Sequence, residues 1–452
     1  MKRPLSSVAE ATGGRLDGAD ATVTGAASDS RSVRPGDLFV AVAGGRVDGH
    51  SHVDEAIGAG AAGGLVSSDA RFAGSMVRVP DTREALLRLA ADERGSIEAD
   101  VVGITGSSGK TSVKDLAAAV LATRFRVHAS PRSFNTEIGV PLTLLNAPAE
   151  VEVVVCEMGS RGPGHITRLC EVARPAVGVV TNVGPAHLEM FGSVDGVAEA
   201  KGELVEALPD DGTAVLNADD PRVSAFGART RARVIRFGTA PDAEVRGEDL
   251  RLDGSGLASF TLRVPGGSER VELAVPGEHM AWNALAAAAA GVALGLTAGE
   301  CAAGLKEARV SSWRMEVIEG PGGIRILNDA YNANPASMAA ALKAARWIAG
   351  SHGCVAVLGS MAELGTSSDA EHERVGELAA RLGIDHLIVV GEDAGLIAVG
   401  AVREGVEPDR VTRSDTPEEA AEEALRTARP GDVVLVKGSR AAGLERVVEA
   451  MR

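Results

Sequence analysis

The segment "VVGITGSSGKTSVKD", residues 101–115, passes from an apolar run through a glycine-rich turn into a helical pattern. Its turn reads Gly106-Ser107-Ser108-Gly109-Lys110-Thr111. Glycines let backbone N–H groups face phosphate oxygens, a lysine supplies charge, a threonine hydroxyl can ligate Mg²⁺, and a helix N-terminus attracts anions. The segment therefore predicts a phosphate-binding loop between a strand and a helix.

The spacing of this loop departs from the most common form, because the sixth position before Lys110 is Ile104 and not glycine. The loop has the shorter Gly-x-x-Gly-Lys-Thr form, and a glycine-serine turn with an exposed lysine is the alternative. Nucleotide binding leaves the chemistry open, since many proteins with such loops are switches, motors or transporters.

Apolar runs that alternate with helical patterns predict an α/β fold of three domains in the 452 residues. Residues 1–80 predict a small α/β domain, in which "HVDEAIGAGAAGGLV" is expected to be a helix ended by glycines. Residues 81–311 predict a central parallel-sheet domain that carries the phosphate loop and gains an antiparallel hairpin between about 244 and 276. Residues 312–452 predict a doubly wound, Rossmann-like domain.

Composition excludes several classes of partner. The formal net charge of −16 argues against nucleic acids and anionic membrane surfaces. No signal peptide is recognised, and the most apolar run, "ALAAAAAGVALGLTAG", is shorter than a membrane span. The four cysteines lie too far apart to suggest a disulfide framework or a zinc site, so we expect a cytoplasmic protein with no membrane span.

Polar residues near the ends of the central strands are candidates for the phosphate site. Glu157 ends the strand "VEVVVCE", where a carboxylate can hold Mg²⁺ or can simply end the strand. His187 and Lys201 flank a loop, although each alone is more typical of a structural or solvated side chain. His279 and Asn283 share one helix face, where the amide could contact a base or only pack against another helix.

The last domain places polar residues after two of its strands. Asp329 follows "IRILN" and could bind ribose hydroxyls. Lys437, Ser439 and Arg440 end the final strand as a positive cluster, with a helix cap and solvated charges as the alternative.

Taken together, these segments resemble the muramyl ligases, ATP-dependent enzymes that add amino acids to the UDP-linked precursor of peptidoglycan. The resemblance covers nearly the whole chain and is carried by "SDSRSVRPGDLFVAVAGGRVDGH", "GITGSSGKTSVKD", "FNTEIGVPLTLL", "CEMGS", "TNVGPAHLEMFGS", "AKGEL", "NDAYNANPASM", "VLGSMAELG" and "VKGSRAAG". Of these, "YNANPASM", "GSMAELG" and "VKGSRAAG" are typical of the member that adds a dipeptide.

The resemblance implies an ATP-dependent, peptide-bond-forming ligase with two Mg²⁺ ions. ATP would activate the terminal carboxylate of UDP-N-acetylmuramoyl-tripeptide as an acyl phosphate, and the amine of D-Ala-D-Ala would then attack it. We expect a monomer, and because three domains would close on three substrates, we expect hinges near 81 and 312. Two departures from the family pattern, at Met280 and Trp313, leave the contacts to the base open.

The resemblance also implies roles for individual residues. The catalytic set is Lys110, His187 and Lys201, and Lys201 would be carbamylated, because a carbamate can ligate a metal that repels an ammonium. The metal ligands are Thr111, Glu157, His187 and Lys201. The nucleotide would contact Gly106, Ser107, Ser108, Gly109, Lys110, Thr111, Ser112, Asn283, Arg314 and Asp329. The uridine end would contact Ser30 and Arg31, and the remaining substrate contacts would be Asn135, Thr136, Glu137, Asn332, Lys437, Ser439 and Arg440.

The residues alone leave other functions open. A sister ligase could add the third residue of the stem peptide, although the tetrapeptide Asp-Asn-Pro-Arg expected of the diaminopimelate-adding enzyme is absent. A folate ligase would lack the "SDSR" uridine segment. A phosphate-loop switch or transport ATPase would leave the outer domains unexplained.

Overall fold

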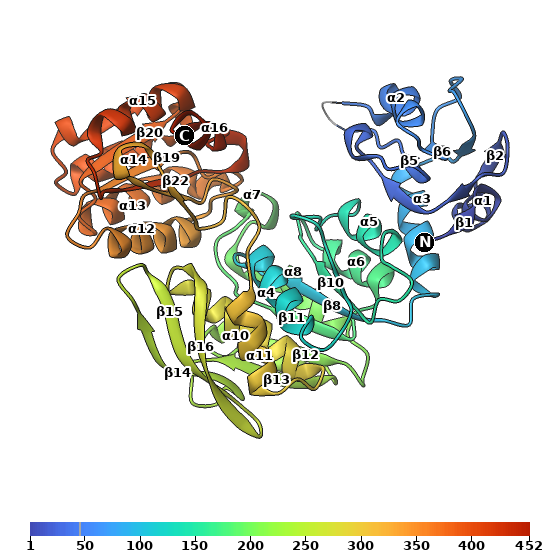
Figure 1. Cartoon of the computed structure of the whole chain (residues 1–452), viewed down its shortest axis with the longest axis horizontal. Coiled ribbons are helices and arrows are strands. Elements are labelled where there is room, and N and C mark those ends of the chain that lie inside the picture. Colours follow the sequence, from blue (N-terminus) through green and yellow to red (C-terminus); the bar gives the residue numbers. More distant parts are fainter. Residues whose placement is uncertain (45–46) are drawn as a thin grey trace.

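The computed structural model describes residues 1–44 and 47–452. Gly45 and Arg46, which belong to the stretch "SDSRSVRPGDLFVAVAGGRVDGH", lie outside the described residues. The chain forms three α/β units, and the N-terminal and C-terminal units lie on opposite sides above the central unit (Figure 1). None of the helices in the described ranges is both long enough and apolar enough to cross a membrane.

The N-terminal unit holds a five-stranded sheet of order β2-β7-β6-β5-β4, in which only β2 is antiparallel to its neighbour. Its elements are β1 (Arg3–Pro4), α1 (Leu5–Thr12), β2 (Arg15–Asp17), β3 (Thr22–Val23), β4 (Gly25–Ala27), β5 (Asp37–Val40), α2 (Val53–Gly58), β6 (Gly63–Val66) and β7 (Met76–Arg78).

One predicted helix in this unit was wrong in its second half. The helix α2 ends at Gly58, and "GGLV" forms the buried strand β6. A Cβ at Gly63 would lie 2.7 Å from Leu5 Cδ1, and one at Gly64 would lie 2.6 Å from Met76 Sδ. These two glycines therefore let neighbouring side chains pack onto the strand backbone, and they do not act as a helix stop.

The central unit holds a nine-stranded sheet of order β16-β15-β14-β13-β12-β11-β8-β10-β9. Its strands are β8 (Asp100–Thr105), β9 (Val127–Ala129), β10 (Val153–Glu157), β11 (Val177–Val180), β12 (Thr213–Asn217), β13 (Arg233–Gly238), β14 (Val245–Leu252), β15 (Leu257–Val264) and β16 (Gly267–Pro276). The pairs from β9 to β14 are parallel, and β14, β15 and β16 form an antiparallel meander that contains the predicted hairpin.

Helices cover both faces of the central sheet (Figure 1). One face is covered by α4 (Lys110–Leu121), α10 (His279–Ala293) and α11 (Ala298–Glu307). The other face is covered by α3 (Thr82–Arg94), α5 (Gly139–Leu145), α6 (His165–Ala173) and α8 (Val194–Glu206), with the short helices α7 (Leu188–Phe191) and α9 (Pro221–Ala225) nearby. This arrangement places the carboxyl ends of β8, β10 and β11 at one edge of the sheet.

The C-terminal unit holds a six-stranded sheet of order β17-β18-β22-β19-β20-β21, in which only β17 is antiparallel to its neighbour. Its strands are β17 (Glu316–Glu319), β18 (Arg325–Asn328), β19 (Cys354–Leu358), β20 (His386–Val390), β21 (Val411–Ser414) and β22 (Val433–Lys437). Its helices are α12 (Pro335–Ala349), α13 (Ser368–Arg381) and α14 (Gly395–Arg403) on one face, and α15 (Pro417–Thr427) and α16 (Glu445–Ala450) on the other. These layers confirm the predicted doubly wound arrangement.

The segment that joins the central and C-terminal units is held from both sides. The backbone N–H and the hydroxyl of Ser311 both donate to Asp115 Oδ2 at 2.8 Å. Two residues later, the carbonyl of Trp313 accepts a hydrogen bond from the N–H of Tyr331 at 3.3 Å. The N–H of Met315 donates to Asp329 Oδ1 at 3.2 Å. The segment therefore passes from contacts with α4 to contacts with the C-terminal unit within a few residues.

Candidate functional site

The predicted phosphate loop lies between β8 and α4. Gly106 and Gly109 have φ angles of +149° and +78°, which glycine adopts without the steric cost that other residues meet there. The Lys110 ammonium folds back over the loop and donates to the carbonyl of Gly106 at 2.6 Å. Burial lowers the pKa of Lys110; the charge of Glu157 opposes this shift, and that of Arg314 adds to it. The loop is therefore a compact cradle with a cation at its centre.

The end of the neighbouring strand β11 holds this loop in shape. Asn182 Oδ1 accepts from the backbone N–H of Ser108 at 3.0 Å, and Thr181 Oγ1 donates to the carbonyl of Ser108 at 2.7 Å. The Ser107 hydroxyl donates to the carbonyl of Gly184 at 3.0 Å. Sequence reasoning missed Thr181 and Asn182, although their place after a strand parallel to β8 was the available signal.

A buried carboxylate faces the first turn of α4. Glu157 is 1% exposed, its Oε2 accepts from the Thr111 hydroxyl at 2.8 Å, and its Oε1 accepts from Asn135 Nδ2 at 2.7 Å. The Thr111 hydroxyl also lies 3.0 Å from Ser133 Oγ. A carboxylate and a hydroxyl held side by side next to the loop are donors that suit Mg²⁺, which takes its remaining ligands from phosphates and water. Among the residues that the structure describes, no group of three or more His, Cys, Asp or Glu side chains is arranged to hold a metal ion without further ligands.

His187 and Lys201 approach the loop from the α7 and α8 side. Lys201 lies on α8 and is 2% exposed, and burial followed by the charge of Lys110 lowers its pKa well below the ordinary value. Burial also lowers the pKa of His187; the charges of Lys110 and Lys201 act in the same direction, and the Glu363 carboxylate opposes them. The structure therefore brings the three predicted catalytic residues into one neighbourhood. The His187 ring contacts the carboxylate of Glu363 from the C-terminal unit, a partner that sequence reasoning missed.

Two further residues of the C-terminal unit contact the phosphate loop or the residues beside it. Arg314 Nη2 donates to Ser133 Oγ at 3.1 Å, and its guanidinium lies 4.2 Å from the centre of the Tyr331 ring. Asn334 Nδ2 donates to the carbonyl of Ser107 at 3.4 Å. Arg314 was predicted here, whereas Ser133 and Asn334 were not, because nothing in their local sequence marks a contact across the units.

Asp329 and Lys437 form an internal pair at the ends of β18 and β22. Lys437 Nζ lies 2.5 Å from Asp329 Oδ2 and donates to the carbonyl of Asn332 at 2.9 Å. The lysine side chain is 2% exposed and that of the aspartate 14%. The structure thus brings together three residues that the sequence assigned to ribose and substrate contacts.

The other two residues of the predicted positive cluster, Ser439 and Arg440, differ in exposure. Ser439 is 1% exposed, and its hydroxyl has no hydrogen-bond partner in the described part of the chain. Arg440 is exposed, pairs with Glu445 at 2.5 Å, and lies 4.9 Å from the centre of the Trp313 ring.

Asn283 lies on the inner side of α10. It is 7% exposed, and a Cβ added to Gly109 would lie 2.5 Å from its Oδ1. Its Nδ2 lies 3.3 Å from Met280 Sδ. The amide therefore packs directly under the phosphate loop, one turn beyond His279. Ser112, in the first turn of α4, is also buried.

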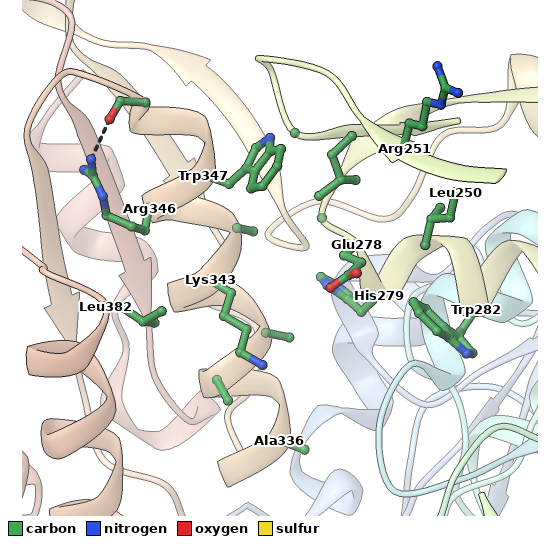
Figure 2. A pocket seen from close by; sticks show the side chains of 17 residues that line it. Leu250, Arg251, Glu278, His279, Trp282, Ala336, Lys343, Arg346, Trp347 and Leu382 are labelled. Atoms are coloured by element: carbon green, nitrogen blue, oxygen red, sulfur yellow. Dashed lines mark hydrogen bonds between the residues drawn. The ribbon is translucent and has the colours of Figure 1, made fainter. Parts of the chain in front are cut away.

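A groove of about 1080 Å³ opens beside this helix, between the meander and α12. Figure 2 shows Lys343 and Trp347 projecting from α12 toward Glu278, His279 and Trp282 at the start of α10. The indole N–H of Trp282 donates to Asp219 Oδ2 at 2.6 Å, and that of Trp347 donates to the carbonyl of Asp253 at 2.8 Å. The groove is therefore walled by fixed aromatic rings and carries charged groups at its edges.

The residues predicted for the distant ends of the substrate have local partners. In the N-terminal unit, Ser30 Oγ donates to Glu55 Oε2 at 3.0 Å, and Arg31 pairs with Asp29 at 2.7 Å. In the central unit, Thr136 Oγ1 accepts from the N–H of Gly139 at 3.4 Å, and Glu137 accepts from Arg168 at 3.3 Å. Of the predicted substrate residues outside the C-terminal unit, Asn135 is the one placed against the Glu157 carboxylate.

Three family models match the chain in succession: the Mur ligase family catalytic domain over residues 22–94, the Mur ligase middle domain over 104–291, and the Mur ligase glutamate ligase domain over 313–440. The chain belongs to the Mur ligase family. This Mur ligase is 40% identical to the UDP-N-acetylmuramoyl-tripeptide--D-alanyl-D-alanine ligase of Mycobacterium tuberculosis strain H37Rv, over 99% of its own length and 97% of that protein.

Solved structures agree with this family assignment. This Mur ligase is similar to MurF from Acinetobacter baumannii, with a TM-score of 0.87, 29% identity, and coverage of 100% of this chain and 99% of that one. It is also similar to MurF ligase from Thermotoga maritima in complex with ADP, with a TM-score of 0.81, 31% identity, and coverage of 95% and 97%. The predicted three-domain α/β architecture is thereby confirmed.

Proposed function

We propose that this Mur ligase joins D-Ala-D-Ala to UDP-N-acetylmuramoyl-tripeptide with consumption of ATP, through an acyl phosphate. The observation that carries the proposal is the full-length likeness to UDP-N-acetylmuramoyl-tripeptide--D-alanyl-D-alanine ligase, combined with a phosphate loop whose cation and carboxylate are in place. The products are the pentapeptide precursor, ADP and phosphate. The third stem residue is left open between lysine and diaminopimelate.

Binding of the triphosphate falls to the loop of residues 106–112. The N–H groups of Ser107 and Ser108 donate to Asn182, so we assign the phosphates to the backbone N–H groups of Gly109, Lys110 and Thr111 at the N-terminus of α4, and Lys110 neutralises part of their charge. Thr111 and Glu157 would hold one Mg²⁺, and His187 with a carbamylated Lys201 would hold a second. When bound, these ions offset the repulsion between the attacking carboxylate and the γ-phosphate.

The lowered pKa of Lys201 supports its carbamylation. Only the neutral amine attacks CO₂, and burial beside Lys110 increases the neutral fraction at a given pH. The product is a carboxylate-like anion, which would relieve the repulsion among Lys110, Lys201 and His187. Carbamylation therefore turns an unfavourable cluster of bases into a balanced metal site.

The nucleoside would lie between the central and C-terminal units. We assign base contacts to Asn283 and to the adjacent end of the groove at His279, and ribose contacts to Asp329. Arg314 can reach the phosphates, because it already contacts Ser133 beside Thr111. The C-terminal unit would thus complete the nucleotide site when it docks on the loop.

The precursor would span the molecule from the N-terminal unit to the loop. Ser30 and Arg31 would hold the uridine end, and Asn135, Thr136 and Glu137 the peptide. Asn332, Lys437, Ser439 and Arg440 would bind D-Ala-D-Ala and the carboxyl end of the precursor. The buried hydroxyl of Ser439, which has no partner in the described chain, supports a polar ligand at this position.

We further propose that the enzyme acts in the cytoplasm as a monomer. All four cysteines are free and buried, which suits a reducing compartment. One chain supplies every residue to which a role is assigned above.

The test is phosphate release by the purified protein with ATP, Mg²⁺ and UDP-N-acetylmuramoyl-tripeptide, with and without D-Ala-D-Ala. Glutamate, lysine and diaminopimelate replace the dipeptide in parallel reactions. We expect release that requires both the precursor and D-Ala-D-Ala. Release without an amine would point to a simple ATPase, and release with a single amino acid would point to a sister ligase.

A further inference from the structure

The loop of residues 359–365, "GSMAELG", carries Glu363 on a rigid support. Met361 and Leu364, on either side of Glu363, are each 2% exposed. The N–H of Met361 donates to Nε2 of His372 at 2.9 Å, and Nδ1 of His372 donates to the carbonyl of Ser368 at 2.7 Å. Buried Met361 and Leu364, together with the hydrogen bonds of His372, fix this loop so that the Glu363 side chain lies outside the C-terminal core.

This loop meets the His187 segment at three points. The Glu363 carboxylate contacts His187 Nδ1, and the Glu363 carbonyl accepts from the N–H of Glu189 at 3.3 Å. A Cβ added to Gly365 would lie 3.1 Å from the Cα of Glu189, so the two backbones are in close approach. The two segments therefore touch through their backbones as well as through the two side chains, so the contact is more than a pair of surface charges.

His187 Nδ1 has no stronger partner within the described residues. The atom is buried and forms no hydrogen bond of regular geometry, and the Glu363 carboxylate is the group in contact with it. His187 has a φ of +52° and Glu363 one of +63°, so both residues adopt left-handed backbone conformations at the point where they meet. Such conformations are unfavourable for non-glycine residues, and they persist where the surrounding structure imposes them.

We propose that Glu363 is a positioning residue, which holds the His187 imidazole by Nδ1 and leaves Nε2 free to bind the second Mg²⁺ beside the loop. A carboxylate on one ring nitrogen fixes the tautomer and orientation of a metal-binding histidine and strengthens its other nitrogen as a ligand. Since the carboxylate comes from the C-terminal unit, the second metal site is complete only when that unit is docked. This inference rests on the proposed function, because that function supplies the metal.

Simple ion pairing explains the contact less well. The side chains of His187 and Glu363 are 28% and 41% exposed, and pairs exposed to this extent contribute little to stability. A pair retained only for stability would also need neither the two left-handed residues nor the braced loop. Positioning accounts for all three observations.

The experiment compares Glu363→Ala and Glu363→Gln with the parent, and with Glu392→Gln as a matched control. Glu392 is an exposed acid of the same unit and lies outside the site. Mn²⁺ replaces Mg²⁺, and its binding is measured by electron paramagnetic resonance in the presence of a non-hydrolysable ATP analogue and the precursor. Ligation is measured separately as a function of Mg²⁺ concentration, and thermal unfolding verifies that each variant is folded.

We expect Glu363→Ala to retain one tightly bound Mn²⁺ and to bind the second about 10-fold more weakly or worse. Its ligation rate should recover in part at high Mg²⁺. Glu363→Gln should lose less, because its amide oxygen can take the place of the carboxylate oxygen beside Nδ1, and Glu392→Gln should match the parent. Second-site Mn²⁺ binding by Glu363→Ala within twofold of the parent would overturn the inference. A parent that binds Mn²⁺ but does not ligate would instead refute the proposed function.

Discussion

Removal of the cation from the buried Asp329–Lys437 pair tests how much this pair contributes to the stability of the C-terminal unit. In Lys437→Met, the Asp329 carboxylate keeps one backbone donor, the N–H of Met315, and loses the ammonium at 2.5 Å. Deleting one member of a buried pair costs about 3–5 kcal/mol, and the 14% exposure of Asp329 favours the lower end. We expect a loss of about 3 kcal/mol, or roughly 10 °C in the melting temperature for a domain of this size.

The assay is thermal unfolding followed by tryptophan fluorescence, because two of the three tryptophans, Trp313 and Trp347, lie within residues 312–452. Lys343→Met is the control, since Lys343 is an exposed lysine on α12. The double variant Asp329→Asn/Lys437→Met should be more stable than Lys437→Met, because it leaves no uncompensated charge. A melting temperature of Lys437→Met within 2 °C of that of Lys343→Met, both followed by tryptophan fluorescence, would refute the reasoning.

Three further predictions concern the loop, the metal site and pH. Gly109→Ala should lower ATP affinity at least about 10-fold, through left-handed strain and a clash with Asn283, and an ATP-binding titration should show a smaller loss when the same change is made in Asn283→Ala than in the parent. Lys201→Ala should abolish ligation, and added short carboxylates should rescue it over a concentration series; no rescue at any concentration would count against the carbamate. Burial lowers the pKa of His128 and His279, so below about pH 6.5 the unfolded chain binds more protons than the folded one. The melting temperature should therefore fall between pH 7 and 5.5, and it should fall less steeply in His128→Gln.

Local sequence determined much of the central unit. The strand before the phosphate loop, the helix after it and the hairpin between 244 and 276 have strong period and turn signals, and the structure confirms them. Strand β6 was mistaken for part of a helix, because its two glycines carry no apolar periodicity, and their role depends on Leu5 and Met76. Strands β14 and β21 are short of apolar residues and are defined by their partners.

Contacts across long sequence separations were harder to predict. Asn182 lies 74 residues from Ser108, and Asn334 lies 227 residues from Ser107. Neither amide has a local pattern that marks its partner, because docking of separate units creates the contact. The resemblance to a known family pointed to His187 and Lys201, whereas the supporting residues Ser133, Asn182 and Glu363 required the structure. The roles assigned to the site residues and the boundaries at 80 and 311 stay predictions.

The short connection between the central and C-terminal units limits how the latter can move. Ser311 is tied to Asp115 of α4, and Trp313 is tied to Tyr331, so Ser312 is the one residue between the two anchors. Any movement of the C-terminal unit relative to the central unit should therefore concentrate its change in backbone angles at Ser312, which lies where a hinge is predicted. Asn334 and Glu363 both belong to the C-terminal unit and would move with it. Their contacts with the phosphate loop and with His187 should therefore form and break together.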